Sequence, residues 1–552
     1  MVEREQPNNY KVFLPCAGTG SRLSDKTKHI NKALISVGNK PVISHIVEKF
    51  EDGIEFIVAL GYKGDYIRQF LELTYPKKKF TFVNIDLYEG QGSGLGYTLN
   101  YCKKYLQSKF IFISNDTIII DEIPSMTKRN WKNWIGYSTK FIGKDYRSLK
   151  LENGKVKRLL EKNEDSPITY IGLCGIDDYK TFWKHMDESS ILKDELLQEK
   201  IDSGEIEPSS IPILTGESFG LQKMLEDNID FDAIQFDWYD AGNIEILEKA
   251  KKLLKPKDSP NILDKPDEAI WFVNDSVIKF SIDENFIKNR VDRSKLLEHF
   301  VPRIIDSTKN MYKYQFVNGD TLSKRVTNEN FKFFLELLKD FHIPNKKTKK
   351  FSKLCRDFYE SKTYERVDYY FKRFNLKDSN REVINGQKVE SISHLLELID
   401  WSWISNGIPV RFHGDLHFEN ILVPTNNNFH TPPYLFVDWR QDFCGDLKVG
   451  DIYYDFAKIF HGLIISHELI DKNLFSFERN MNEIKYDFLV KNINLDCQRI
   501  FIEWLDRNGY DSKKVEVMTA LIFLNISGLH HHPYSHLLFS LGKTMLSNLY
   551  EK

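Results

Sequence analysis

Apolar runs of strand length alternate with helical patterns in the first part of the chain. The runs lie at 11–16, 54–60, 80–86 and 110–116, and apolar residues recur at helical spacing between them, as in 41–50 and 96–106. Strands that alternate with helices predict a doubly wound, mostly parallel α/β sheet. Ligands of such sheets bind at the carboxyl ends of the strands. A Gly-rich turn after residue 16 and the carboxylate of Asp116 are therefore predicted to lie at one site.

The pattern changes at "KKLLKPKDSPNILDKPDE" (251–268), where three prolines and mixed charges follow a helical segment. This composition is typical of a linker and predicts two domains, 1–257 and 258–552. After the linker, "AIWFVNDSVIKFS" (269–281) predicts two short strands with a turn at Asn274-Asp275. Long amphipathic helical patterns then continue to the end. We expect a bilobal α+β domain, with a small β lobe and a large helical lobe.

Composition narrows the classes of function. The chain has 552 residues, which is too many for one core, and its 41% hydrophobic residues suffice for several. The net charge of -2 gives no field that would attract nucleic acid, so small-molecule substrates are expected. Six scattered cysteines without a CxxC pair, a polar start and the lack of an apolar run of membrane length predict a cytoplasmic protein with no membrane span. The sequence does not predict the oligomeric state, and a homo-oligomer is one of the possibilities.

The turn "AGTGSR" (17–22) presents consecutive backbone N–H groups after a strand. Such a turn binds phosphate oxygens, and Arg22 adds a positive charge. Because no third Gly follows Gly18 and Gly20, the turn is not a dinucleotide fingerprint, and it lacks the Lys of a Walker loop. We therefore predict a nucleotide site that includes Ser21 and belongs to neither of these classes.

Further motifs follow this turn in order. They are "NKALISVGNKPVISH" (31–45), "GQGSGLGYTL" (90–99), "SND" ending at Asp116, and "FDWYDAGN" with Asp240. Residues 10–250 thereby resemble the sugar-phosphate and phosphocholine nucleotidyltransferase family, although Asn31 stands where that family commonly has Pro. The resemblance implies a Rossmann-like domain in which Lys32 and Arg22 act on the phosphates and the base is held by Gln91, Gly92 and Ser93.

The same resemblance implies that Asp116 and Asp240 bind Mg²⁺ on the α-phosphate, and two carboxylates suit that ion. It also places the phosphorylated acceptor against "LEK" (160–162) and "YIGLCGI" (170–176). The implied substrate-binding residues there are Glu161, Lys162 and Gly175.

The second half contains "HGDLHFEN" (413–420), in which an Asp precedes an Asn by five residues. Phosphoryl transfer needs a base for the hydroxyl, metal on the phosphates and a Lys on the nucleotide. Asp415 fits the base and Asn420 a metal ligand. In "YLFVDWR" (434–440) the β-type run ends at Asp438, which fits a second metal ligand. Lys279 is predicted to contact the nucleotide, and Glu298 is predicted to be its ion-pair partner.

Residues 262–552 resemble the choline kinase and aminoglycoside phosphotransferase family, by this loop and by "GDIYYDFAK" (450–458), where Asp451 is expected to be a structural support. His413 is expected to be a scaffold residue. For "LHHHPYSH" (529–536), packing or substrate contacts are preferred over a metal site. Five aromatic residues are interpreted as core, with a cage for a quaternary ammonium as the alternative: Trp401, Trp403, Trp439, Tyr453 and Tyr454.

A kinase makes a phosphomonoester and a nucleotidyltransferase of this family consumes one. The sequence thus predicts a bifunctional enzyme that uses ATP, an NTP, most simply CTP, and Mg²⁺. The resemblance implies a choline- or ethanolamine-like alcohol, activated for a downstream transferase that decorates a surface glycan or lipid. Two alternatives stay open: a sugar kinase fused to a sugar-1-phosphate nucleotidyltransferase, and a chain in which one half is an inactive binding module. Arg440, Gln441 and Asp442 favour hydroxyl recognition over a cation cage.

Overall fold

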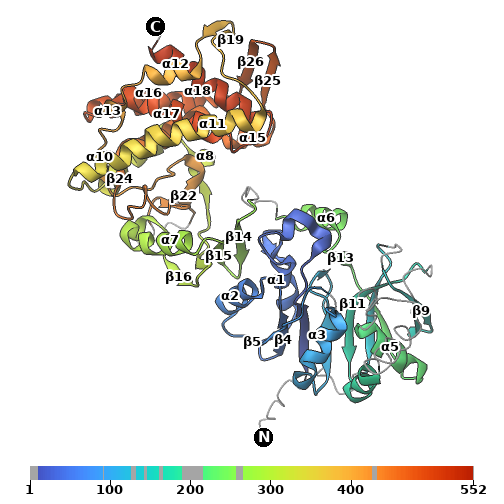
Figure 1. Cartoon of the computed structure of the whole chain (residues 1–552). Helices are drawn as coiled ribbons and strands as arrows, with labels where there is room; N and C mark the ends of the chain where they lie inside the picture. Colours follow the sequence, from blue (N-terminus) through green and yellow to red (C-terminus); the bar gives the residue numbers. More distant parts are fainter. Residues whose placement is uncertain are drawn as a thin grey trace. The chain divides into compact units, whose positions relative to one another are not determined.

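The computed structural model describes residues 10–90, 92–125, 132–141, 146–160, 166–188, 216–256, 265–425 and 432–550. The chain forms two compact units (Figure 1). The first comprises Met1–Glu284 with Asp306–Lys313, and the second Asn285–Ile305 with Tyr314–Lys552. The predicted boundary between residues 257 and 258 lies outside the described residues.

A nine-stranded sheet forms the centre of the first unit, in the order β5-β4-β1-β6-β11-β8-β12-β10-β9. The four runs predicted as strands are its first four members: β1 (Lys11–Cys16), β4 (Glu55–Leu60), β5 (Lys79–Asn84) and β6 (Phe110–Ile113). They pair in parallel, with Val12 opposite both Phe56 and Ile111. This half of the sheet confirms the predicted doubly wound α/β fold.

Strand β1 has hydrophobic side chains on both of its faces. Val12 and Leu14 belong to one core cluster, and Phe13 belongs to another. Successive side chains of a strand point to opposite faces, so each face needs a cover of its own. The helices that pack around the sheet are α1 (Val42–Val47), α2 (Gly64–Thr74), α3 (Leu95–Cys102) and α5 (Glu217–Glu226) (Figure 1). Helix α6 (Ile244–Leu254) packs instead in a separate core cluster with Val37, Ile118 and Tyr239.

Beyond β6 the sheet becomes mixed. Its remaining strands are β8 (Trp134–Ser138), β9 (Ser148–Glu152), β10 (Lys155–Leu160), β11 (Thr169–Ile176) and β12 (Asp232–Gln235). β11 runs antiparallel to both β6 and β8, whereas β12 is parallel to β8. A tight turn at Asn153-Gly154, both with positive φ, makes β9 and β10 an antiparallel hairpin. The parallel arrangement therefore holds for the strands that carry the Gly-rich turn and Asp116.

The hairpin of β14 (Glu268–Val273) and β15 (Ser276–Ser281) belongs to the first unit. Its turn lies at the predicted Asn274-Asp275, both with positive φ, as in a type I′ turn. Trp271 is fully buried in the core cluster of the first unit, with its ring 5.1 Å from that of Phe70. Its indole N–H donates to Ser36 Oγ at 3.0 Å. These strands thus share a hydrophobic core with the nine-stranded sheet.

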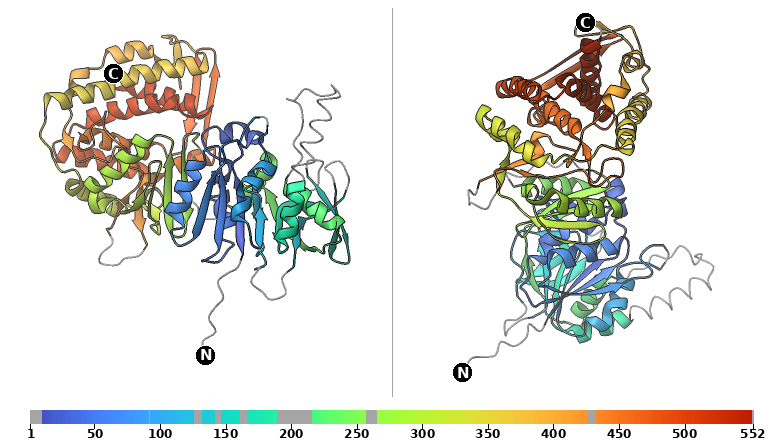
Figure 2. Two further views of the ribbon diagram at one scale, coloured as in Figure 1. Left: turned by 60° about the horizontal axis from the view of Figure 1, so that its bottom comes forward. Right: turned by 90° about the vertical axis from the view of Figure 1, so that its left-hand side faces the viewer.

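The second unit is mainly helical. Six of its larger helices pack beside one another (Figures 1 and 2): α9 (Asn328–Phe341), α11 (Lys362–Phe374), α14 (Ile452–Ile464), α16 (Asn492–Arg507), α17 (Ser512–Ser527) and α18 (Tyr534–Tyr550). Helix α7 (Glu284–Leu297) lies apart from this group (Figure 1). Three short strands hold the predicted kinase loop: β18 (Gly319–Thr321), β22 (Ile421–Pro424) and β23 (Leu435–Phe436). The helical content agrees with the predicted large helical lobe.

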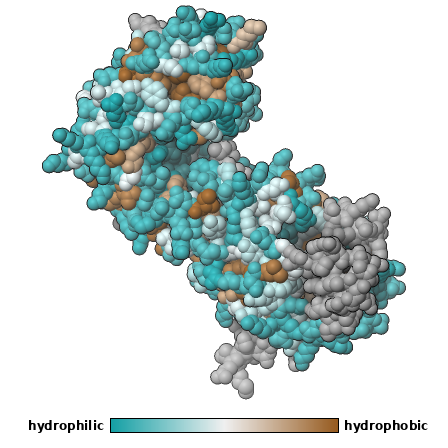
Figure 3. Space-filling view, in the orientation of Figure 1, coloured by the Kyte–Doolittle hydropathy of each residue, from teal (hydrophilic) through white to brown (hydrophobic). Residues whose placement is uncertain are grey.

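The visible face of the molecule is largely hydrophilic, with hydrophobic residues in scattered groups (Figure 3). Among the described residues, no helix combines the length and the apolar character needed to cross a bilayer.

Candidate active sites

A two-stranded ladder in the first unit brings Asp116 and Asp240 together. β13 (Trp238–Asp240) pairs antiparallel with β7 (Thr117–Ile119), so that Asp240 lies opposite Thr117. The N–H of Ala241 then donates to the carbonyl of Asp116 at 2.8 Å. A Cβ added to Gly242 would lie 2.8 Å from Asp116 Oδ2 and 3.0 Å from Asp240 Oδ1. The two carboxylates therefore face one point beside Gly242, where any larger residue would displace their side chains.

Two cations lie at this pair of carboxylates. Lys32 Nζ is 2.8 Å from Asp116 Oδ2, and Arg22 Nη2 is 3.4 Å from the position that a Cβ of Gly242 would take. Burial acts to raise the pKa of Asp116, but Lys32 and Arg22 outweigh it and the net pKa is lowered. Burial and the negative charge of Asp116 raise the pKa of Asp240. Tyr146 donates to Asp240 Oδ2 at 2.8 Å and opposes that shift.

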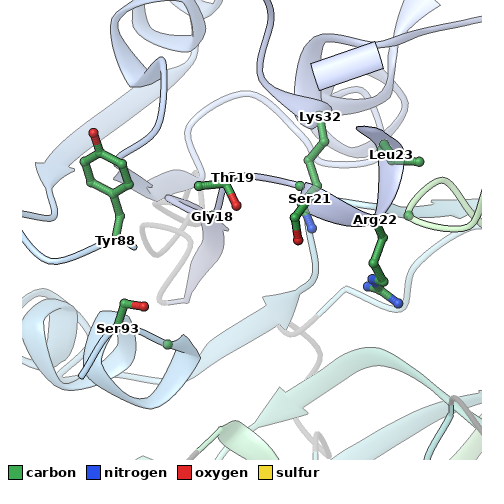
Figure 4. A pocket seen from close by; sticks show the side chains of 11 residues that line it. Gly18, Thr19, Ser21, Arg22, Leu23, Lys32, Tyr88 and Ser93 are labelled. Atoms are coloured by element: carbon green, nitrogen blue, oxygen red, sulfur yellow. The ribbon is translucent and has the colours of Figure 1, made fainter. Parts of the chain in front are cut away.

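A cavity of about 270 Å³ opens beside these residues (Figure 4). The Gly-rich turn with Arg22 and Lys32 lies on one side of it, and Tyr88 and Ser93 lie on the other. Its lining is formed by Gly18, Thr19, Gly20, Ser21, Arg22, Leu23, Lys32, Tyr88, Ser93, Gly94 and Gly242. Two predicted glycine-rich loops, more than 60 residues apart, thus border one cavity. Tyr88 is an aromatic lining residue that the sequence analysis did not single out.

Mg²⁺ fits the donor set of this site. Asp116 and Asp240 offer carboxylate oxygens, the ligands that Mg²⁺ prefers. The ammonium of Lys32 lies at hydrogen-bond distance from Asp116, which shows that the carboxylate is placed to hold a cation. The same two side chains would hold the ion, and the ion would supply charge neutralisation on the triphosphate.

Of the three residues predicted to bind the acceptor, the structure describes only Gly175. Glu161 and Lys162 lie outside the described residues, as does Gln91. Gly175 is not brought to the site, since it is buried within the sheet opposite both Ile111 and Trp134.

Gly172, which the prediction passed over, approaches the loop of Asp116 instead. Its carbonyl accepts from the N–H of Ser114 at 2.9 Å, and a Cβ on Gly172 would lie 2.5 Å from Ser114 Oγ. Gly92, in the second Gly-rich loop, has positive φ but is not among the residues that line the cavity. Of the two glycines of "YIGLCGI", the first therefore lies beside the loop of Asp116, and a contact of this segment with the acceptor remains a prediction.

In the second unit, backbone hydrogen bonds hold the predicted kinase loop against the segment of Asp438. The N–H of Val437 donates to the Asn420 carbonyl at 2.8 Å, and the N–H of Arg440 donates to the His413 carbonyl at 3.0 Å. His413 Nε2 donates to the Val437 carbonyl at 3.1 Å, while its Nδ1 accepts from the N–H of Asp415 at 3.2 Å. Burial lowers the pKa of His413 to about 4, so this buried ring is neutral and acts as scaffold.

Asp415 is surrounded by donors. Lys458 Nζ lies 2.9 Å from its Oδ1, His417 Nε2 lies 3.7 Å from its Oδ2, and the Asn420 amide donates to its carbonyl at 2.9 Å. Burial acts to raise the pKa of Asp415, but Lys458 and His417 hold it well below the usual value. The side chain remains 34% exposed, so a hydroxyl can reach an ionised carboxylate.

Asp455 positions this loop and was not predicted. Its Oδ2 accepts from the N–H of His413 at 2.7 Å, and its Oδ1 accepts from the N–H of Gly414 at 2.6 Å. His342 Nε2 lies 3.1 Å from Oδ2, and the carboxylate is fully buried. Asp451, one turn earlier, caps α14 and accepts hydrogen bonds from Ile408 N–H and Tyr359 Oη. Its contacts are those of the expected structural support.

The other predicted kinase residues have charged partners of their own. Asp438, with positive φ, pairs with Arg290 of α7. Glu298 Oε2 lies 3.1 Å from Arg411 Nη1. Lys279 is on β15, which belongs to the first unit, so its pairing with Glu298 remains a prediction. The oxygens of Asn420 and Asp438 suit Mg²⁺, and these two side chains would hold it, where it would neutralise phosphate charge.

The histidines of 529–536 do not form a metal site within the described part of the chain. The described residues contain one other group of possible metal ligands, which consists of His417, Glu419 and His467. His536 Nδ1 bonds with Tyr370 Oη at 2.6 Å, in line with packing. Four of the aromatic residues considered for a cage are buried, and Trp439 donates to the Arg290 carbonyl. Trp403 is half-buried and its indole N–H donates to Asp511 at 2.8 Å.

Both halves of the chain are similar to known enzymes. Residues 293–474 match the family model APH, described as the phosphotransferase enzyme family. The second unit thus contains a phosphotransferase-family domain. The amino-terminal region matches nucleotidyltransferases.

Two curated relatives illustrate that second match. The bifunctional protein GlmU of Methanococcus vannielii is 29% identical over 153 residues, which are 27% of this chain and 35% of that protein. A probable glucose-1-phosphate cytidylyltransferase of Bacillus subtilis is 25% identical over 222 residues, which are 36% of this chain and 86% of that protein. The chain thus spans about a third of the length of the GlmU relative.

Among solved structures, the CTP:phosphocholine cytidylyltransferase LicC of Streptococcus pneumoniae has a TM-score of 0.34 and 20% identity, over 45% of this chain and all of that one. A putative glucose-1-phosphate thymidylyltransferase of Bacillus anthracis has a TM-score of 0.35 and 20% identity, over 47% of this chain and 98% of that one.

Proposed function

We propose that the chain catalyses two consecutive reactions. The second unit transfers a phosphoryl group from ATP to a small alcohol, and the first unit couples the resulting phosphomonoester to a nucleotide and releases pyrophosphate. The observation that carries the proposal is the pairing of Asp116 with Asp240 beside a glycine-lined cavity, in a chain whose other unit presents Asp415 on a kinase-type loop.

In the first unit, the Gly-rich turn, Arg22 and Lys32 bind the triphosphate, because backbone N–H groups and cations suit phosphate oxygens. The phosphomonoester oxygen attacks the α-phosphorus in line, the bond to the β-phosphate oxygen breaks, and pyrophosphate leaves. Gly92, Ser93 and Gln91 are proposed to read the base, and Tyr88 offers a ring for it to stack on. Glu161 and Lys162 remain the proposed acceptor residues.

In the second unit, Asp415 accepts a hydrogen bond from the acceptor hydroxyl and receives its proton as the oxygen attacks the γ-phosphorus of ATP. The bond from that phosphorus to the β–γ bridging oxygen breaks, and ADP leaves. Lys458 and His417 keep this carboxylate ionised before the reaction. Asn420 and Asp438 are the proposed metal ligands, and Lys279 with Glu298 the proposed nucleotide contacts.

CTP is the proposed nucleotide for the first unit. The Bacillus subtilis relative, matched over 86% of its length, is named a cytidylyltransferase. The same name favours a second candidate function, a sugar kinase fused to a sugar-1-phosphate nucleotidyltransferase, since it specifies glucose 1-phosphate. The choline- or ethanolamine-like acceptor follows from the family resemblance alone. In either case the product would be the activated donor for a downstream transferase that decorates a surface glycan or lipid.

The test is to incubate the purified chain with ATP, CTP and Mg²⁺ and a panel of amino alcohols, polyols, hydroxy acids and sugars, and to search by mass spectrometry for CDP-linked products. Asp415→Asn should abolish ADP formation but leave coupling of a supplied phosphomonoester intact. Asp116→Asn should do the reverse. If no panel member and no NTP yields a linked product, the proposal is wrong, and if one variant has no effect, that half is a binding module.

A further inference from the structure

A group of positive charges adjoins Asp415 in the second unit. Lys458, on α14, forms the 2.9 Å ion pair with Asp415. Lys362, the first residue of α11, and Arg440 both contact the ring of Phe358, with Lys362 Nζ 4.2 Å and Arg440 Cζ 5.0 Å from its centroid. We call Lys362, Arg440 and Lys458 the cation cluster.

Two members of this cluster, Lys362 and Arg440, have no carboxylate partner among the residues that the structure describes. Neither Lys362 nor Arg440 has a carboxylate oxygen within 4.0 Å in the described part of the chain. Arg440 Nε donates to the backbone carbonyl of Asp442 at 3.0 Å, whereas the carboxylate of Asp442 accepts from the N–H of Gly445. Charges that are partly buried without a counter-charge are costly, so their retention at a reactive carboxylate indicates a ligand.

Electrostatics at Lys362 point the same way. Burial, followed by the positive charges of Arg440, Lys458 and Arg366, lowers the pKa of Lys362 to about 7. A bound anion would reverse the effect of those charges. A quaternary ammonium would add another positive charge, and the aromatic face that could have received it, Phe358, is already contacted by two cations.

We propose that the cation cluster binds a carboxylate or phosphate group carried by the acceptor alcohol, so that the kinase half phosphorylates a small anionic alcohol. This inference rests on the proposed function and specifies its substrate class. The hydroxyl of the acceptor reaches Asp415, and the anionic group a few bonds away lies against Lys362 and Arg440. A phosphate of ATP is the other source of an anion, and the experiment separates the two.

The experiment measures ADP release by the full-length protein with ATP and Mg²⁺ for three matched sets of alcohols. The anionic set is glycerate, glycerol phosphate and a sugar acid, the neutral set is glycerol and glucose, and the cationic set is choline and ethanolamine. We expect an anionic alcohol to have a kcat/KM at least about tenfold above the others. Lys362→Met should raise the KM for that alcohol by about 10- to 100-fold, the effect of losing one charge-assisted hydrogen bond, and leave the KM for ATP unchanged.

The matched control is Lys372→Met, on the exposed side of the same helix, where the lysine pairs with Asp368. It should behave as the native protein. Preference for a cationic or neutral alcohol overturns this inference and leaves the proposed function standing, and so does a Lys362→Met variant that changes only the KM for ATP. Phosphorylation of no alcohol in any set overturns both. Correct folding of each variant is verified by its melting temperature.

Discussion

Lys32 Nζ lies 2.8 Å from Asp116 Oδ2, so the predicted phosphate-binding lysine and the predicted metal-binding aspartate form an ion pair. Lys32 begins a short 3-10 helix (Lys32–Leu34) in the segment after β1, and Asp116 follows β6, the neighbouring parallel strand. The pair shows how the carboxyl edge of the sheet holds both signs of charge before a nucleotide arrives.

The first prediction concerns this ion pair. Lys32→Gln should lower kcat for nucleotidyl transfer by about 100- to 1,000-fold, because it removes a preorganised positive charge from the triphosphate site. Pyrophosphate release measures the effect, with a supplied phosphomonoester as substrate. Lys26→Gln is the control, since Lys26 pairs with Glu248 at the surface and should leave the rate unchanged. A Lys32→Gln rate within threefold of native would contradict a role on the phosphates.

The second prediction tests the close approach at Gly172. Its φ is +66° and a Cβ would lie 2.5 Å from Ser114 Oγ, so Gly172→Ala should displace the loop of Asp116. We expect a loss of about 1 to 3 kcal/mol in the free energy of unfolding and a reduced rate of nucleotidyl transfer. Gly154→Ala is matched to it, because Gly154 has φ of +75° but open space around its Cβ position. If both variants lose the same stability and activity, contact with Ser114 is unimportant.

The third prediction concerns Asp455. Asp455→Asn would replace a carboxylate oxygen with an amide that cannot accept from both His413 N–H and Gly414 N–H. Breaking such a buried charged network should destabilise the second unit by about 3 to 5 kcal/mol. The lower melting temperature should be accompanied by a fall in kcat for phosphoryl transfer with the KM for ATP little changed. Asp471→Asn, on the neighbouring helix α15 (His467–Asp471), provides a comparison outside this network.

The fourth prediction follows from the lowered pKa of Lys362. A lysine whose folded-state pKa is about 7 instead of 10.5 destabilises the fold fully below pH 7, and this penalty disappears as the pH rises towards 10.5. Lys362→Met should therefore be more stable than the native chain by about 1 to 3 kcal/mol at pH 6, with the difference shrinking towards pH 10. Melting temperatures across this range provide the measurement. A variant less stable at pH 6 would show that Lys362 has an internal counter-charge.

Much of the first site could be predicted because its signals are local. The strand runs ending at Cys16 and Ile113, the glycines of the turn, and Asp116 and Asp240 all lie in short motifs whose residue types suit phosphate or metal. That Asp116 and Asp240 act together was implied only by the family resemblance, and the pairing of β7 with β13 that brings them together was not predicted, because it depends on tertiary structure.

The parts that escaped prediction depend on contacts distant in sequence. Asp455 and Lys458 lie in the helix "IYYDFAK", and nothing in their spacing reveals that they turn towards residues 413–415. Periodicity predicts that α14 is amphipathic, but not which loop its buried polar side chains meet. For the same reason Gly175 and Gly172 could not be told apart until the register of β11 against β6 was known.

The shared core around Trp271 has a practical consequence for dissecting the protein. A fragment that stops at the linker would lose Trp271, and with it the ring contact to Phe70 and the hydrogen bond to Ser36. Such a fragment should be aggregation-prone, whereas one that ends near residue 284 would keep the hairpin. The two activities therefore cannot be separated by cleaving the chain at the linker (251–268). The core of the first unit includes the β14–β15 hairpin, which follows the linker in sequence.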